Sequence, residues 1–173
     1  MTSDPLTALS PLDGRYAGKV DALRDHFSEC GLIRCRLRVE IEWLKALAGE
    51  PHFAEIPAFS PSTVAELDAL VANFSVEQAA AVKAIESVTN HDVKAVEYWI
   101  KDKTKANAEV IKVSEFIHFA STYEDLNNLE PALTCQGARE PAMLPSPKKV
   151  IDRHKGLAHP KHTRTSITHT QRK

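Results

Sequence analysis

The sequence predicts an all-α protein, and two observations lead to this prediction. Apolar residues recur at steps of three to five positions through most of the chain up to residue 137, as on the buried face of a helix. No Asn-Gly or Asp-Gly pair joins two alternating stretches as in a β-hairpin, because Asp13-Gly14 has no strand pattern on either side. We expect an N-terminal helical domain followed by the beginning of a bundle of long helices.

The first helices are predicted from their apolar spacing. One set of apolar residues marks a short helix and a second set a long one that stops near Gly49 and Pro51, as helices do at glycine and proline. The sets are Val20, Leu23 and Phe27, then Leu32, Ile33, Leu37, Ile41, Leu44 and Leu47.

The next two helices are predicted from their capping residues. Ser60 reads as an N-cap and Pro61 as the first residue of a helix over 61–73. Ser75 with Gln78 three positions later fits a capping box, and that helix should end around Thr89.

Three further helices follow in the prediction. Asp92 can cap a helix whose inner side carries Val93, Val96, Trp99 and Ile100. Another is expected over 108–119. A last one, capped by Thr122, should run to about Gly137, although Pro131 inside it would remove a backbone hydrogen bond at a cost of about 3 kcal/mol.

Composition and length fit one ordinary globular domain. The chain has 173 residues, of which 43% are hydrophobic and 26% are charged. It contains no apolar run of membrane-spanning length and no signal-peptide pattern near Met1. Its three cysteines form no Cys-x-x-Cys pair, so we expect reduced thiols in a cytoplasmic protein. Because no apolar run of sufficient length is present, we expect no membrane partner.

The charge changes sign near Pro141. Residues 1–140 hold 14 Lys and Arg against 22 Asp and Glu, whereas residues 141–173 hold 8 against 1. We therefore expect an N-terminal helical domain over 1–112, the start of a helical bundle over 113–140, and a basic, poorly ordered tail over 141–173. The tail lacks aromatic residues for base stacking, so nucleic acid is not an expected partner.

Polar residues between the predicted helices are the candidates for function. Arg15 can bind a phosphate or carboxylate through two hydrogen bonds, and Tyr16 beside it offers a donor or a stacking face. Asn90, His91 and Asp92 stand at a helix start, where free backbone N–H groups favour an anion. Surface exposure, packing and helix capping are the ordinary alternatives for all five.

A third polar segment precedes and opens the helix from Thr122. Ser121 and Thr122 place hydroxyl groups before a helix N-terminus, which suits a carboxylate ligand, although capping explains Thr122 equally well. Asn127 and Asn128 are poor helix formers and need another reason for their place in the helix. His118 has the simpler interpretation of a hydrogen-bonded core histidine.

Taken together, these segments resemble one family. The strings SPLDGRY, TNHDVKAVEY and SEFIHFAST-x-EDLNNL, from about Leu6 to Arg139, are similar to the fumarase and aspartase superfamily, in particular to its bacterial members that cleave adenylosuccinate. The resemblance covers most of this chain and well under half of a family member.

The resemblance implies a reaction and an assembly. The reaction is a β-elimination that releases fumarate from adenylosuccinate, giving AMP, and from the related succinyl carboxamide ribotide of purine synthesis. A general base removes a proton beside a carboxylate, and a histidine acid protonates the leaving nitrogen. The family uses no metal and no organic cofactor, and three subunits of a homotetramer build each site.

Carried over by motif, the resemblance also assigns roles. Arg15 and Tyr16 would bind the nucleotide, and Asn90, His91 and Asp92 would line its phosphate side, with His91 as a candidate for proton transfer. The remaining assignments are Thr122 and its neighbour Tyr123 for the succinyl carboxylate, and His169 as the candidate acid.

The chain departs from the family pattern in several places. Tyr123 stands where the pattern has serine, Pro131 and Glu140-Pro141 interrupt the expected long helix, and the loop with the family's catalytic serine is absent. These departures leave an alternative open, a non-catalytic, truncated relative that acts as a helical interaction or nucleotide-binding protein. A frameshift or a premature stop would produce a bundle helix that ends in a basic tail with prolines. A naturally short protein is the other explanation.

Overall fold

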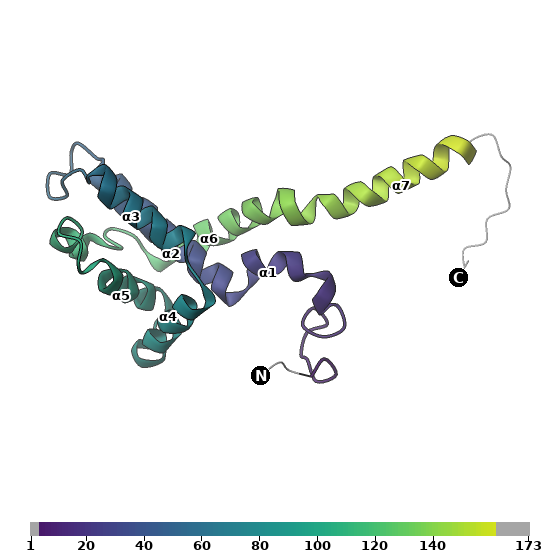
Figure 1. Cartoon of the computed structure of the whole chain (residues 1–173), viewed down its shortest axis with the longest axis horizontal. Coiled ribbons are helices and arrows are strands. Elements are labelled where there is room, and N and C mark those ends of the chain that lie inside the picture. The colour runs from purple at the N-terminus through teal and green to yellow at the C-terminus, as the bar shows by residue number, and fades with distance from the viewer. Residues whose placement is uncertain (1–3, 162–173) are drawn as a thin grey trace. The chain divides into compact units, whose positions relative to one another are not determined.

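The computed structural model describes residues 4–161, and in this range it contains helices and turns but no strand, which confirms the all-α prediction. Contacts divide the chain between Gly137 and Ala138 into a first and a second unit. The α-helices of the first unit are α1 (Asp21–Phe27), α2 (Glu29–Ala48), α3 (Pro61–Ala72), α4 (Val76–Thr89), α5 (Asp92–Thr104) and α6 (Tyr123–Ala138), the last ending at the boundary (Figure 1).

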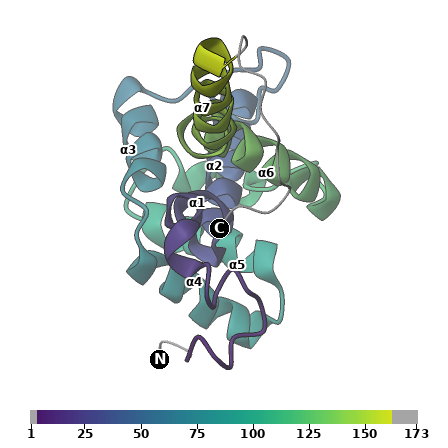
Figure 2. The same cartoon turned by 90° about the vertical axis from the view of Figure 1, so that its right-hand side faces the viewer.

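Helix α2 is the centre of the first unit. Its apolar residues Ile33, Leu37, Ile41 and Leu44 are almost fully buried, since their spacing places them on one side of the helix. This side faces α3, α4 and α5, while α1 packs near its N-terminus. Figure 2 shows α2 among these neighbours.

The other helices complete the core with one or a few large side chains each. Leu67 of α3, Val82 of α4 and Trp99 of α5 have almost no exposed surface. Phe74, between α3 and α4, meets the Trp99 ring edge-on with centroids 5.5 Å apart. Such aromatic contacts add to the apolar burial that holds the helices together.

Three predicted N-caps are confirmed and one is wrong, and among the confirmed ones the Thr122 hydroxyl accepts from the Asp125 N–H at 3.3 Å. The Ser60 side chain accepts from the Thr63 N–H with Pro61 at the first helical position, and Ser75 and Gln78 form a full capping box. The N-cap of α5 is His91 and not Asp92, which is the first residue of that helix.

One expectation about the segments around α6 was wrong and one is confirmed. The expected helix over 108–119 is only a short 3₁₀ element, η2 (Ile111–Phe116), in which Val113 has non-helical angles. The helix predicted from Thr122 to about Gly137 with Pro131 inside it is confirmed, since α6 continues through Pro131 to Ala138. A buried leucine and glutamate, Leu126 and Glu130, anchor the turn that precedes this proline.

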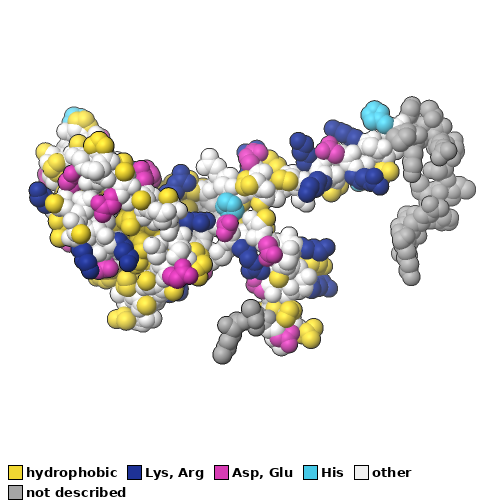
Figure 3. Space-filling view, viewed as in Figure 1, with side chains coloured by type: hydrophobic (Ala, Val, Ile, Leu, Met, Phe, Trp, Pro, Cys, Tyr) yellow, Lys and Arg dark blue, Asp and Glu magenta, His cyan; other side chains and the backbone are white. Residues whose placement is uncertain are grey.

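The second unit contains η3 (Arg139–Met143), a single π-type turn, and α7 (Pro145–Lys161). The composition predicted poor order here, whereas the structure is helical as far as Lys161. Pro145 and Pro147 lie in the first turn of α7, where a missing N–H costs little. Lysine and arginine side chains follow one another along α7 (Figure 3). No helix between residues 4 and 161 is long and apolar enough to cross a membrane.

Candidate functional site

The structure brings together residues from two of the predicted motifs. The ring of His91, at the start of α5, lies 4.2 Å from the ring of Tyr123, at the start of α6. The Tyr123 ring also stacks on His118, with centroids 5.4 Å apart and an angle of 19°. We call His91, Asp92, His118 and Tyr123 the His91 cluster.

His91 is held by the backbone of the helix that it caps. Its Nδ1 accepts a hydrogen bond of 3.3 Å from the Lys94 N–H. A ring nitrogen that accepts carries no proton, so the neutral imidazole carries its proton on Nε2. Asn90 supplies the left-handed turn before it, with φ of 52°, a conformation that asparagine tolerates better than most residues. The cap therefore leaves Nε2–H as the donor that a ligand can meet.

Asp92 is engaged in an ion-pair network. One oxygen lies 2.6 Å from Nη1 of Arg36, and Nε of Arg36 lies 3.0 Å from the Glu130 carboxylate. Burial would raise the pKa of Asp92, but the Val93 N–H and the Arg36 guanidinium outweigh it and lower that pKa. Asp92 is thus an ionised anchor between α2 and α5, and its charge opposes an anionic ligand at this helix start.

Arg36 and Glu130 were missed by reasoning from the sequence. Both are buried, at 8% and 7% exposed, and they are 94 positions apart. Arg36 stands beside the core residue Leu37, but Arg34 and Arg38 flank it at alternate positions, so the sequence does not single out Arg36. The sequence does not reveal the partner either, because the pairing depends on how α2 and α6 pack.

His118 is confirmed as a hydrogen-bonded, half-buried histidine. Its Nδ1 lies 2.6 Å from Oε1 of Glu40, a carboxylate on α2 that is 1% exposed. Burial raises the pKa of Glu40, and the imidazole beside it opposes this rise. The sequence indicated the histidine but not its acidic partner, 78 positions away.

The other predicted site residues do not join this cluster. The Arg15 guanidinium lies 4.8 Å from the ring of its neighbour Tyr16, and within residues 4–161 no hydrogen bond, ion pair or ring contact connects either to the cluster. The Thr122 hydroxyl donates to the Asp125 carboxylate at 2.8 Å, so it already has a partner. His169 lies outside the described residues.

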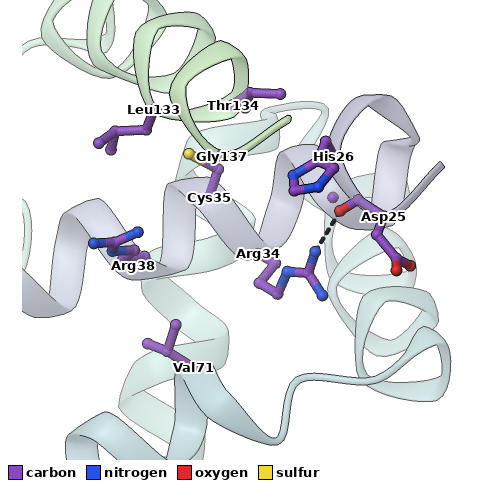
Figure 4. A pocket seen from close by; sticks show the side chains of 10 residues that line it. Asp25, His26, Arg34, Cys35, Arg38, Val71, Leu133, Thr134 and Gly137 are labelled. Carbon is purple, nitrogen blue, oxygen red and sulfur yellow. Dashed lines mark hydrogen bonds between the residues drawn. The ribbon is translucent and has the colours of Figure 1, made fainter. Parts of the chain in front are cut away.

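A separate cavity of about 250 Å³ lies beside α2 in the first unit (Figure 4). Its basic groups do not converge, because Arg34 donates to the backbone oxygen of Asp25 while Arg38 points away from Arg34. Burial raises the pKa of the Cys35 thiol, which donates to the Glu130 carbonyl. This cavity therefore offers neither an anion site nor a reactive thiol.

No cluster within residues 4–161 has the three or more side chains that a metal site needs. The polar groups of the His91 cluster instead offer hydrogen bonds and a stacking surface. A donor nitrogen beside an exposed phenol ring suits a polar, partly aromatic ligand.

Comparison with known proteins identifies the family. The family model described as lyase matches residues 14–172. The chain belongs to this lyase family. The resemblance of the three motifs to the fumarase and aspartase superfamily is therefore confirmed.

Individual members of the lyase family are also similar to this chain. Adenylosuccinate lyases from Escherichia coli and from Haemophilus influenzae are each 52% identical over 158 residues, which is 91% of this chain and 35% of the relative. The adenylosuccinate lyase of Buchnera aphidicola from Schizaphis graminum is 39% identical over 99% of this chain and 38% of its own length. This chain thus spans little more than a third of these relatives.

Proposed function

We propose that this chain forms part of an adenylosuccinate lyase and supplies the nucleotide side of its site. The observation that carries the proposal is the 52% identity to proteins of that name over most of the chain. In the reaction, a base takes a proton from the carbon beside a carboxylate, the carbon–nitrogen bond breaks, and the nitrogen gains a proton. Adenylosuccinate gives fumarate and AMP, and the succinyl carboxamide ribotide gives fumarate and the carboxamide ribotide. No metal or organic cofactor takes part.

The geometry supports a specific role for His91. Within residues 4–161 no hydrogen bond engages its Nε2, so the Nε2–H can donate to a phosphate or ribose oxygen. His91 also remains our candidate for proton transfer. Asp92, paired with Arg36, supports this arrangement as an anchor.

The remaining assignments are proposals from the family. Arg15, Tyr16 and Asn90 bind the nucleotide, Thr122 and Tyr123 meet the succinyl carboxylate, and His169 is the candidate acid. We further propose a homotetramer in the cytoplasm with sites shared between subunits. The exposed apolar side chains of α7 support association, since the structure leaves Val150, Ile151 and Leu157 open to solvent.

Two measurements on the 173-residue chain test this function. The first is calorimetric titration with AMP, in which we expect binding that His91→Ala weakens by about tenfold or more, the size expected when a donor to a charged phosphate is lost. The exposed Val88 is 81% accessible, so Val88→Ala serves as the control without effect. Absence of AMP binding by the folded chain would contradict the nucleotide role.

The second measurement is fragment complementation. The chain is mixed with the complementary part of the Escherichia coli relative, and fumarate release from adenylosuccinate is followed by absorbance. We expect release only when both pieces are present. Its loss in His91→Ala, but not in Val88→Ala, would link the activity to the proposed site.

One observation favours the second candidate, a non-catalytic nucleotide-binding relative. The Tyr123 ring occupies space beside His91, and the neighbouring Thr122 hydroxyl is already bonded to Asp125. AMP binding without complementation, followed by complementation in Tyr123→Ser, would establish this alternative and identify the tyrosine as its cause.

A further inference from the structure

A continuous series of contacts connects the interior of the first unit to His91. It begins at the buried Glu40 carboxylate, 2.6 Å from His118 Nδ1. It continues through the stacked rings of His118 and Tyr123 and ends at the His91 ring, 4.2 Å from that of Tyr123. Glu40 itself lies on α2, and within residues 4–161 no hydrogen bond or ion pair joins it directly to His91.

Packing alone does not explain a carboxylate at position 40. A buried charge is costly unless it is paired, and among residues 4–161 Glu40 has its hydrogen bond with His118. The nearby Glu97 is no partner for it, since Glu97 is itself acidic and bound by Lys94 and Lys101. A hydrocarbon side chain at position 40 would fill the core without this cost, so the carboxylate has a use in holding His118.

The backbone around His118 is also held in an unusual conformation. His118 and Ala120 have φ of 64° and 55°, in the left-handed region that residues other than glycine rarely adopt. Such conformations persist where surrounding contacts impose them. The Glu40 hydrogen bond is one such contact, and the Trp43 indole N–H, which donates to the Phe119 carbonyl at 2.8 Å, is another. Both fix the segment that presents the His118 ring to Tyr123.

We propose that His118, held by Glu40, is a positioning residue for His91 and acts through the Tyr123 ring. The stacked His118 ring limits how Tyr123 can rotate, and Tyr123 in turn limits the His91 ring. Together with the cap to Lys94, this contact fixes the direction in which the free Nε2 of His91 points. The expected effect on AMP binding rests on the proposed nucleotide role of His91. The positioning of the His91 ring by His118 and Tyr123 does not depend on that role.

Nuclear magnetic resonance of the 173-residue chain tests the geometry without any ligand. Cross-relaxation between the rings of Tyr123 and His91 should be observed in the parent chain. In Glu40→Leu it should disappear, because His118 loses its acceptor and Tyr123 loses its support. Glu40→Gln is the matched control, since its amide oxygen still accepts from the imidazole and should preserve the signal.

A second pair of variants covers the case in which Glu40→Leu does not fold. Tyr123 is 44% exposed, so its substitution leaves the core intact. Tyr123→Phe should keep its ring against both histidines. Tyr123→Leu should release the His91 ring, seen as loss of its cross-relaxation with the Lys94 amide proton. An unchanged His91 ring signal in Tyr123→Leu, or in a folded Glu40→Leu, overturns the proposal.

Calorimetric titration with AMP tests the consequence separately. We expect Glu40→Leu to weaken AMP binding by about three- to tenfold, the effect of losing one orienting hydrogen bond, and Glu40→Gln to restore it. If the Tyr123 and His91 rings separate in Glu40→Leu and its AMP affinity still equals that of the parent, the orientation of the His91 ring does not affect AMP binding. That outcome overturns this part of the proposal. A parent chain that binds no AMP refutes the proposed function, while the ring measurements still decide the positioning.

Discussion

Arg36 shows how much can depend on one buried side chain. Its guanidinium contacts a carboxylate on α5 and another on α6, so it connects three helices beside the His91 cluster. Removing it leaves Glu130 buried without its cation. Such an uncompensated charge costs more than the intact pair contributes.

We therefore expect Arg36→Met to lower the free energy of unfolding by about 3 kcal/mol. Urea denaturation followed by circular dichroism measures the change. Arg24→Met is the matched control, since the pair of Arg24 with Asp21 is exposed and should contribute less than about 1 kcal/mol. Equal effects of the two substitutions would show that the Arg36 network does not stabilise the fold.

Asp92 makes part of the stability dependent on acid. Because its pKa is lowered from its ordinary value of 3.8, the folded chain binds this proton less readily than the unfolded chain. Its contribution is thus present above that value and is lost as the pH falls toward the lowered pKa.

We expect unfolding midpoints in urea to fall more steeply between about pH 5 and about pH 2 in the parent than in Asp92→Asn, which cannot titrate there. The quantity to compare is the slope of the urea midpoint against pH in the two chains. A parallel decline of both chains would assign the acid sensitivity to other carboxylates, among them Asp125, whose pKa the Thr122 N–H and hydroxyl also lower.

At the scale of elements, the approach of α1 to α2 depends on a missing side chain. A Cβ on Gly31 would lie 2.7 Å from the backbone oxygen of Asp25 and 2.8 Å from that of His26. These atoms belong to the backbone of α1 and cannot move aside without moving the helix. Gly156, in α7, has no such neighbour within 4 Å.

Gly31→Ala should therefore destabilise the chain by about 1–3 kcal/mol, the usual range for overpacking. Gly156→Ala should instead increase helicity, since alanine is favoured over glycine in a helix by about 1 kcal/mol. Thermal unfolding and far-ultraviolet circular dichroism measure the two changes. A neutral Gly31→Ala would mean that α1 shifts away from α2 without cost.

At the scale of the whole molecule, the two units differ in how much of their surface is buried. The first unit has a core, whereas every residue from 146 to 159 in the second is exposed. Segments with few buried apolar contacts open most readily.

Limited trypsin digestion should accordingly cleave α7 first, at Lys148, Lys149, Arg153 or Lys155. Mass spectrometry should then find a persistent fragment that contains α2 to α5. Early cleavage at Lys45 or Lys101, which are half-buried in ion pairs, would contradict this order. Protection of α7 that rises with protein concentration would support the proposed oligomer.

The sequence by itself determined the helical class, most helix limits and the family. Those features depend on local patterns, since the Ser60 and Ser75 caps bond to residues three positions ahead and the core face of α2 follows from spacing alone. The motifs likewise lie within short stretches of sequence. Even so, a local pattern did not distinguish His91 from Asp92 as the cap of α5, because either side chain can accept the bond.

Only the tertiary structure decided which charged and aromatic groups meet. The pairs Arg36–Glu130 and Glu40–His118 join residues far apart in the chain, and the contact of His91 with Tyr123 joins the starts of two helices. Their formation depends on how α2, α5 and α6 pack, which is set by the burial of the whole core and not by neighbouring residues. For this reason the sequence indicated His91, while only the packing revealed the residues that hold it.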